Sequence, residues 1–486
     1  MKNLFLPLLF LIFSANYAQE LQGTRPNIII VMPDDISFGE HSYYGDIAQT
    51  PHVDDLLEKG QRFSNFHVSP TCAPTRASLL TGRHEFYSGI THTIFMRDQM
   101  ALDQVILPEI LKENGYNTAM FGKWHLGDGE MYRPKQRGFD EVLQHGGGGI
   151  TQNYDHSADF PNNHYNDPVL LYNEKVIEEK GYCTDIFFDY AINWIKKQKK
   201  SKDPFFVYLP TNTVHGPHEP PKGKEGKESI IENLDDNVGK LMQFLDTEKL
   251  SENTLVIYFT DNGAKGGKVK GLRGGKGSAS EGGVLVPAVF YWKGKIENSG
   301  KEIDQLTGHI DLFKTLAAFA GDTRTFDKNK PWDGKNILPL LENAESTDIN
   351  NRYFVAHRSR WKKGVPEDHK YAEASIQNNR FKLYFTAKGE KNLYDLDADL
   401  SEKKDVKNEH PKIYQELLAQ YNAFWKDSKN YMINDTIKAP KTHKPFHELY
   451  KEAYGEEQFN KAYKGQLEYD TFKKEQNRLS KLKVKK

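Results

Sequence analysis

The sequence has few cysteines and almost no net charge, and its one long apolar run lies at its start. Only Cys72 and Cys183 occur among 486 residues, which excludes a fold held together by a disulfide framework. Lys and Arg total 66 against 67 Asp and Glu, and the net charge of -1 gives no reason to expect nucleic acid or an anionic membrane as a general partner. Any anion must therefore bind at a local site. With 37% hydrophobic residues, the chain can bury the core of an enzyme-sized globular protein.

The first residues have the pattern of an export signal. Lys2 precedes an apolar run from Leu4 to Phe13, and small and polar residues follow up to Gln19. The run is shorter than the roughly 20 residues that cross a bilayer, and no cysteine follows it, so a membrane or lipid anchor is disfavoured. We therefore expect a signal peptide over residues 1–18 and an exported protein, periplasmic or secreted, without a membrane span.

Three apolar runs rich in β-branched or aromatic residues each end in polar residues. They are PNIIIVMPDD (residues 26–35), PFFVYLPTNTVHGPH (204–218) and TLVIYFTDNG (254–263). Such runs are typical of buried parallel strands. Because ligands of open α/β sheets bind outside the carboxyl ends of the strands, we expect the three ends to converge on one site.

Apolar residues with helical spacing lie between these strands, over residues 53–60, 107–115 and 184–198. Strands that alternate with helices predict an α/β layered catalytic domain over residues 25–345. Short strand-like pieces and a helical stretch then predict a smaller C-terminal α+β subdomain over residues 346–430. Residues 431–486, rich in Lys, Tyr and Glu, are expected to form a basic and aromatic tail that is helical or partly ordered.

The most specific segment is PTCAPTRASLLTGR, residues 70–83. Cys72 is followed by a Pro two positions on and by Arg76 four positions on, before a helical stretch that ends in Thr-Gly-Arg. A nucleophile at a helix N-terminus, with an arginine one turn away, lies in a field suited to an oxyanion. A buried structural cysteine, or a disulfide between Cys72 and Cys183, is the simpler alternative, but neither accounts for the whole string.

This segment matches, at every defining position, the signature of the type I sulfatases of the alkaline phosphatase superfamily. The chain resembles that family from about Arg25 to Trp425. The resemblance implies a large α/β/α sandwich of the alkaline phosphatase type, with the smaller C-terminal α+β subdomain. It also implies that a maturation enzyme oxidises Cys72 to formylglycine, that the hydrate of this aldehyde attacks sulfur, and that Arg76 holds and polarises the hydrate.

The resemblance further implies a metal site on oxygen-bearing side chains at two strand ends. The implied ligands are Asp34, Asp35, Asp261, Asn262 and the hydrate formed at Cys72. These hard ligands suit Ca2+, which takes about six or more oxygens, and Mg2+ is the alternative. Either acidic pair alone would be typical of a solvated turn or a helix cap. Ser37 stands where the family most often has Gly, a change that affects the turn and removes no ligand.

GYNTAMFGKWHLG, residues 115–127, resembles the second signature of the family, although Phe121 is bulkier than the usual residue at its position. The implied catalytic residues are Lys123, which would bind a sulfate oxygen, and His125, which would accept a proton from the nucleophile. A lone Lys-x-His pattern usually occurs by chance among surface residues. Its place in this series of motifs favours the catalytic interpretation.

TVHGPHEP and LRGGKGSASEGGVLVP resemble the motifs that contact the substrate. His215 is expected to donate a proton to the leaving oxygen, with Lys276 assisting and binding sulfate. His218 and Arg273 are weaker candidates: His218 for the rim of the substrate site, and Arg273 for an acidic group of the substrate or for solvent.

The expected substrate is a sulfated carbohydrate. The insertion at Gln152–Asp167, rich in acids and aromatics, resembles insertions in bacterial polysaccharide sulfatases, including those directed at algal polymers such as ulvan. Two alternatives stay open. One is a phosphoester or phosphonate ester hydrolase of the same superfamily, and the other is a non-catalytic protein that binds sulfated glycans.

Overall fold

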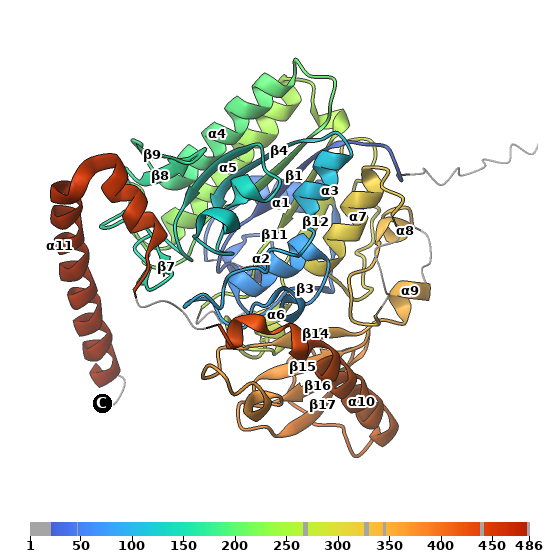
Figure 1. The fold of residues 1–486 in the computed structure, drawn as a ribbon. Helices are drawn as coiled ribbons and strands as arrows, with labels where there is room; N and C mark the ends of the chain where they lie inside the picture. Colours follow the sequence, from blue (N-terminus) through green and yellow to red (C-terminus); the bar gives the residue numbers. More distant parts are fainter. Residues whose placement is uncertain are drawn as a thin grey trace, which may run out of the picture.

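A mixed β-sheet between two layers of helices forms the body of the protein (Figure 1). The computed structural model describes residues 21–45, 47–265, 271–324, 330–343, 347–437 and 442–483, so the expected signal peptide lies outside the described residues. Within them the sheet has nine strands in the order β2-β12-β11-β1-β10-β4-β5-β8-β9. Their bounds are β1 Asn27–Met32, β2 Gln61–Phe63, β4 Asn117–Lys123, β5 Glu141–His145, β8 Val169–Tyr172, β9 Lys175–Glu178, β10 Phe205–Pro210, β11 Thr254–Phe259 and β12 Ala288–Tyr291.

The centre of the sheet is parallel. β1 pairs in parallel with β10 and β11, and β10 pairs in parallel with β4, so the carboxyl ends of these strands lie at one edge. Every residue of β1, β10 and β11 is buried, which accounts for their unbroken apolar sequences. The predicted convergence of three strand ends is confirmed. The outer pairs β11–β12, β12–β2, β5–β8 and β8–β9 are antiparallel.

Helices cover both faces of the sheet because successive residues of each strand point to opposite sides. Ile29 and Val31 of β1 share a core with α1, α4 and α5, whereas Ile28 and Ile30 share a core with α2, α3 and α7. The bounds are α1 Pro51–Lys59, α2 Cys72–Thr81, α3 Leu107–Glu113, α4 Cys183–Gln198, α5 Glu228–Thr247 and α7 Leu312–Phe319. The expected α/β/α arrangement is confirmed, and shorter elements complete it: α6 Glu281–Val284, α8 Leu338–Leu341, α9 Thr347–Asn350, β3 Phe66–His67 and β13 Thr307–Gly308.

A smaller unit follows, as the sequence predicts. Its antiparallel sheet consists of β14 Phe354–His357, β15 Ala374–Gln377, β16 Phe381–Phe385 and β17 Lys391–Asp395. Helix α10, Pro411–Ser428, packs on this sheet through Leu417, Tyr421 and Phe424. Figure 1 shows this unit below the main body.

A buried ionic cluster joins the two units. Lys382 of β16 is fully buried, with its ammonium nitrogen 2.6 Å from Glu281 Oε1 of α6 and 3.3 Å from Glu402 Oε1. His67 Nε2 lies 3.0 Å from Glu281 Oε2. Burial alone would raise the pKa of Glu281, but Lys382 and His67 outweigh it and lower the pKa to about 2.

Arg273 lies at the same contact between the two units, and its side chain keeps 34% of its surface exposed to solvent. Its guanidinium carbon lies 4.1 Å from the ring centroid of Tyr384, and Nη1 donates to the Tyr394 hydroxyl at 3.0 Å. Nε lies 3.4 Å from Glu402. Two aromatic rings and a carboxylate therefore hold the side chain in place.

The C-terminal residues form helix α11, Pro445–Lys483, which is interrupted at Gly455 by a positive φ of 85°. Phe446 and Phe459 of this helix pack with Phe160 and Leu171 in a separate apolar cluster. Figure 1 shows α11 beside β8, β9 and the short hairpin of β6 (Asn153–Tyr154) and β7 (Ser157–Ala158). None of the described helices is long and apolar enough to span a membrane.

Candidate active site

The carboxyl ends of β1 and β11 bring together the four predicted metal ligands. Asp34 and Asp35 follow β1, and Asp261 and Asn262 follow the neighbouring β11, all of them buried. Asn262 Nδ2 donates to Asp35 Oδ1 at 2.8 Å, and the backbone nitrogen of Asp35 donates to Asp261 Oδ1 at 3.2 Å. Asp35 has a left-handed φ of 62°, a strained backbone conformation of the kind often found at functional sites.

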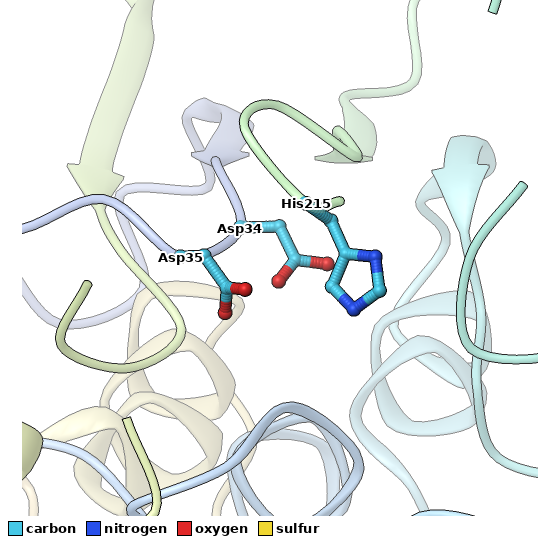
Figure 2. A group of neighbouring side chains, drawn as sticks. All are labelled: Asp34, Asp35 and His215. Atoms are coloured by element: carbon cyan, nitrogen blue, oxygen red, sulfur yellow. The ribbon is translucent and has the colours of Figure 1, made fainter. Parts of the chain in front are cut away.

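This group fits a hard cation. Asp34 Oδ1 and Asn262 Oδ1 are buried and have no hydrogen-bond partner, although such oxygens are normally paired. Asp34, Asp35 and His215 each offer a ligand atom, and these atoms lie within 4.8 Å of one another. Figure 2 shows the two carboxylates and the imidazole ring side by side. Three carboxylates and an amide oxygen are the donor set that Ca2+ and Mg2+ prefer.

Cys72 begins α2, and Arg76 lies one turn further along the same helix. Arg76 Nη2 is 2.9 Å from Asp261 Oδ2 and 3.6 Å from Asp34 Oδ2, while Nη1 donates to the carbonyl of Lys123 at 2.8 Å. Burial raises the pKa of Asp261 well above its usual range, and the charge of Asp34 adds to the effect against the opposing charge of Arg76. Arg76 therefore links helix α2 to the acids that follow β1 and β11.

Two lysines supply positive charge at the same place. The ammonium group of Lys123, at the end of β4, donates to Asp34, and that of Lys276 lies 2.5 Å from Asp35 Oδ1. Burial alone would raise the pKa of Asp34, but Lys123, His215 and Lys276 hold it well below its usual value. Burial would likewise lower the pKa of Lys276, but Asp35 and its neighbours raise it. Asp34 is therefore ionised and Lys276 charged.

His125 is buried and His215 is half-buried, and both are neutral. Burial, with Lys123, lowers the pKa of His125 to about 3, and burial, with Lys276, does the same for His215. His125 Nε2 lies 2.8 Å from the carbonyl of Thr93, which requires this nitrogen to carry the proton. Nδ1 of His125 is buried without a partner, so it is free to accept a proton.

A run of glycines makes room for both imidazole rings. A Cβ atom on Gly148 would lie 2.3 Å from His125 Nε2, and one on Gly149 would lie 2.8 Å from His215 Nδ1. The four consecutive glycines after His145 are a sequence signal for this close packing, and the prediction did not use them. Asp98, which lies 3.9 Å from His125 Nε2, has no recognisable sequence context and was also missed.

The two cysteines are free thiols, so the alternative of a disulfide between them is wrong. Cys183 Sγ donates to Asn212 Oδ1 at 3.3 Å, and burial raises the pKa of this thiol. Cys72 is 2% exposed.

A cavity of about 480 Å³ opens beside the site. Its lining consists of Asp35, Val214, Gly216, Pro217, His218, Lys227 and Lys265, so His218 shares this wall with one of the predicted metal ligands. A larger cavity of about 720 Å³, lined by Tyr172, Tyr190 and lysines of α4, contains none of the predicted site residues.

Comparisons with known proteins agree in the family they point to. A family model described as Sulfatase matches residues 26–322. Human N-acetylgalactosamine-6-sulfatase is 31% identical over 362 residues, 68% of each chain. N-acetylgalactosamine-6-O-sulfatase of Bacteroides thetaiotaomicron is 29% identical over 483 residues, 81% of this chain and 92% of the relative. The crystal structure of Ps i-CgsB in complex with k-i-k-neocarrahexaose has a TM-score of 0.71 and 27% identity, covering 85% of this chain and 100% of that one.

Proposed function

The chain belongs to the sulfatase family, whose members hydrolyse sulfate esters, and we propose that its substrate is a sulfated carbohydrate, its nucleophile a formylglycine made from Cys72, and its metal Ca2+. The observation that carries this proposal is the convergence of Arg76, Lys123 and Lys276 on the acids that follow β1 and β11. Such a set of fixed cations suits a sulfate group that gains charge in the transition state.

Cys72 and the metal-binding group have separate tasks. The hydrate of the formylglycine would supply the attacking hydroxyl and, through its second hydroxyl, a way to eliminate sulfate. The ion would supply positive charge next to the sulfate oxygens, held by Asp34, Asp35, Asp261 and Asn262. Arg76 orients the start of α2 against Asp261, and Lys123 and Lys276 hold sulfate oxygens as point charges.

The two histidines handle protons. His125 accepts the proton of the nucleophile at Nδ1, because Nε2 is committed to the carbonyl of Thr93. His215 donates to the oxygen of the leaving sugar. Because its imidazole is neutral, His215 would donate through a single N–H, with Lys276 assisting.

The relatives support a carbohydrate substrate. Two of them are named for the 6-sulfate of N-acetylgalactosamine, and a third was crystallised with k-i-k-neocarrahexaose. The insertion at Gln152–Asp167 adds algal polymers such as ulvan to the candidates. Incubation with defined oligosaccharides from glycosaminoglycans, carrageenan and ulvan, followed by mass spectrometry of the products, tests the class. No desulfation of any sugar, together with turnover of an aryl sulfate, would contradict it.

Peptide mass spectrometry of residue 72 tests the nucleophile. Protein made in a host with a formylglycine-generating enzyme should carry formylglycine there, and protein that retains the thiol should be inactive. Comparison of an aryl sulfate, an aryl phosphate and a phosphonate monoester separates the sulfatase from the alternative esterases. N-terminal sequencing of the exported protein tests cleavage after residue 18 and delivery to the periplasm or medium.

A further inference from the structure

Arg360 is a half-buried cation with no carboxylate within 4.0 Å in the part of the chain that the structure describes. Among the arginines that the structure describes as buried or half-buried, every other one has a carboxylate oxygen within 4.0 Å. Arg360 has no such partner among the described residues, and its Nε is buried without a hydrogen bond. Because a desolvated charge without a partner is costly, an arginine kept in this state is suited to an external anion.

The backbone of Arg360 is fixed next to the catalytic residues. Ser359 and Arg360 have left-handed φ values of 54° and 66°, and the nitrogen of Arg360 donates to the carbonyl of Thr91 at 3.0 Å. Two residues further on, the carbonyl of Thr93 accepts the hydrogen bond from His125. One loop therefore positions both the catalytic imidazole and this arginine.

Groups of the active site lie close enough to the guanidinium of Arg360 to shift its pKa. Burial lowers the pKa of Arg360, and the nearby charge of Arg358 acts in the same direction. Cys72 and Asp35 oppose this shift, as does Tyr154. The side chain therefore lies within electrostatic range of the nucleophile and of Tyr154, a residue of β6.

An exposed aromatic pair includes Tyr154, whose charge acts on Arg360. Phe95 belongs to the loop that contains Thr91 and Thr93, and Tyr154 belongs to the insertion. The ring centroids are 5.6 Å apart with the planes at 74°. Both side chains are 47% exposed, and Phe95 has a left-handed φ of 63°. Aromatic faces in such a position suit the apolar C–H face of a sugar ring.

We propose that Arg360, Phe95 and Tyr154 form a subsite for the sugar next to the one that loses its sulfate, and that this neighbouring sugar carries an anionic group. The inference rests on the proposed carbohydrate substrate. A carboxylate and a second sulfate share the chemistry that Arg360 would bind, since a guanidinium forms paired hydrogen bonds with either group.

Arg360→Gln tests the subsite, with Arg358→Gln as the matched control because Arg358 is exposed two residues earlier. The probes are three disaccharides in which N-acetylgalactosamine 6-sulfate is linked to glucuronic acid, to galactose sulfate or to galactose, together with an aryl sulfate. With R360Q, kcat/KM should fall about tenfold or more on one or both charged disaccharides, mainly because KM rises. This loss is measured relative to the change on the galactose disaccharide and on the aryl sulfate. If kcat/KM falls most on the glucuronic acid disaccharide, Arg360 binds a carboxylate. If it falls most on the galactose sulfate disaccharide, Arg360 binds a second sulfate.

R358Q should change all four substrates by the same small factor. Tyr154→Ala should raise KM for every disaccharide, including the neutral one, relative to the aryl sulfate. An equal loss by R360Q on all four substrates would overturn the subsite.

If the wild-type protein turns over the aryl sulfate but desulfates neither these disaccharides nor any oligosaccharide of the wider panel, the substrate class fails, and calorimetry then decides the subsite separately. The charged disaccharides should bind the Cys72→Ala protein at least about tenfold more tightly than they bind the Cys72→Ala/Arg360→Gln protein. Equal affinity would overturn the inference.

Discussion

Gly148 lies directly against His125, and a Cβ atom on Gly148 would be 2.3 Å from both Cε1 and Nε2 of the imidazole ring. Gly148→Ala must therefore push the ring away from the carbonyl of Thr93. We expect kcat/KM to fall by about 100-fold, because small displacements of a catalytic group have effects of this size. Gly129→Ala is the control, since its Cβ would meet Tyr132 at an ordinary 3.4 Å. Full activity of Gly148→Ala would show that His125 is not the proton acceptor.

His215→Ala should damage hydrolysis of a sugar sulfate more than that of a nitrophenyl sulfate. A sugar alkoxide is a poor leaving group that needs a proton, whereas nitrophenolate leaves with little help. Lys123→Ala should lower both rates by similar factors, because it removes charge from sulfate oxygens that both esters share. Steady-state kinetics of both variants on both esters gives the comparison. Equal losses in His215→Ala would assign donation to Lys276 or His125.

Removal of divalent metal should abolish turnover and leave the secondary structure intact, because the ligands lie at strand ends outside the core. Calcium should restore activity better than magnesium. It should also raise the stability by about 2.7 kcal/mol at 100 times its Kd. Circular dichroism, calorimetry and turnover before and after chelation measure these effects. Full turnover in protein with verified zero metal content would contradict the ligand assignment.

Lys382→Met should destabilise the protein by about 3–5 kcal/mol at neutral pH, because it leaves Glu281 and Glu402 buried without their cation. The exposed Lys388→Met is the control. The native pKa of Glu281, about 2, lies below its ordinary 4.5, so its stabilising contribution is present above pH 4.5 and is lost between pH 4.5 and 2.

In Lys382→Met the same carboxylates have raised pKa values and gain stability on protonation. The difference in free energy of unfolding between the variant and the wild type should therefore become smaller as the pH falls from 4.5 to 2. Urea unfolding at several pH values measures it, and a difference that does not change with pH would contradict the ionic role of Lys382.

The central strands and the ends that carry the site could be predicted because their signals are local. A buried parallel strand needs a continuous apolar run, and the acids after β1 and β11 follow such runs directly. The segment around Cys72 is equally local. Strand β15, by contrast, was not predicted, because its four residues, ASIQ, are too few for an alternating pattern to stand out.

Contacts between distant segments could not be predicted. The position of Arg360 depends on how the C-terminal sheet packs against the loop of Thr91, and Arg273 is held by tyrosines from β16 and β17. Periodicity gives the buried face of an element but not its partner. The packing of α11 on Phe160 depends on the same kind of long-range choice.

The burial of Cys72 determines when another enzyme can modify its thiol. All ten residues of α2 are buried, so a second enzyme has no access to the thiol once the domain has folded. On the proposed formylglycine mechanism, we expect maturation to compete with folding, and a chain that folds first to retain its thiol. A formylglycine-generating enzyme should convert residue 72 in the unfolded chain and leave the folded thiol protein unchanged, which mass spectrometry can follow. We therefore expect the active fraction of a preparation to be set during synthesis, by the rate of Cys72 conversion relative to the rate of folding.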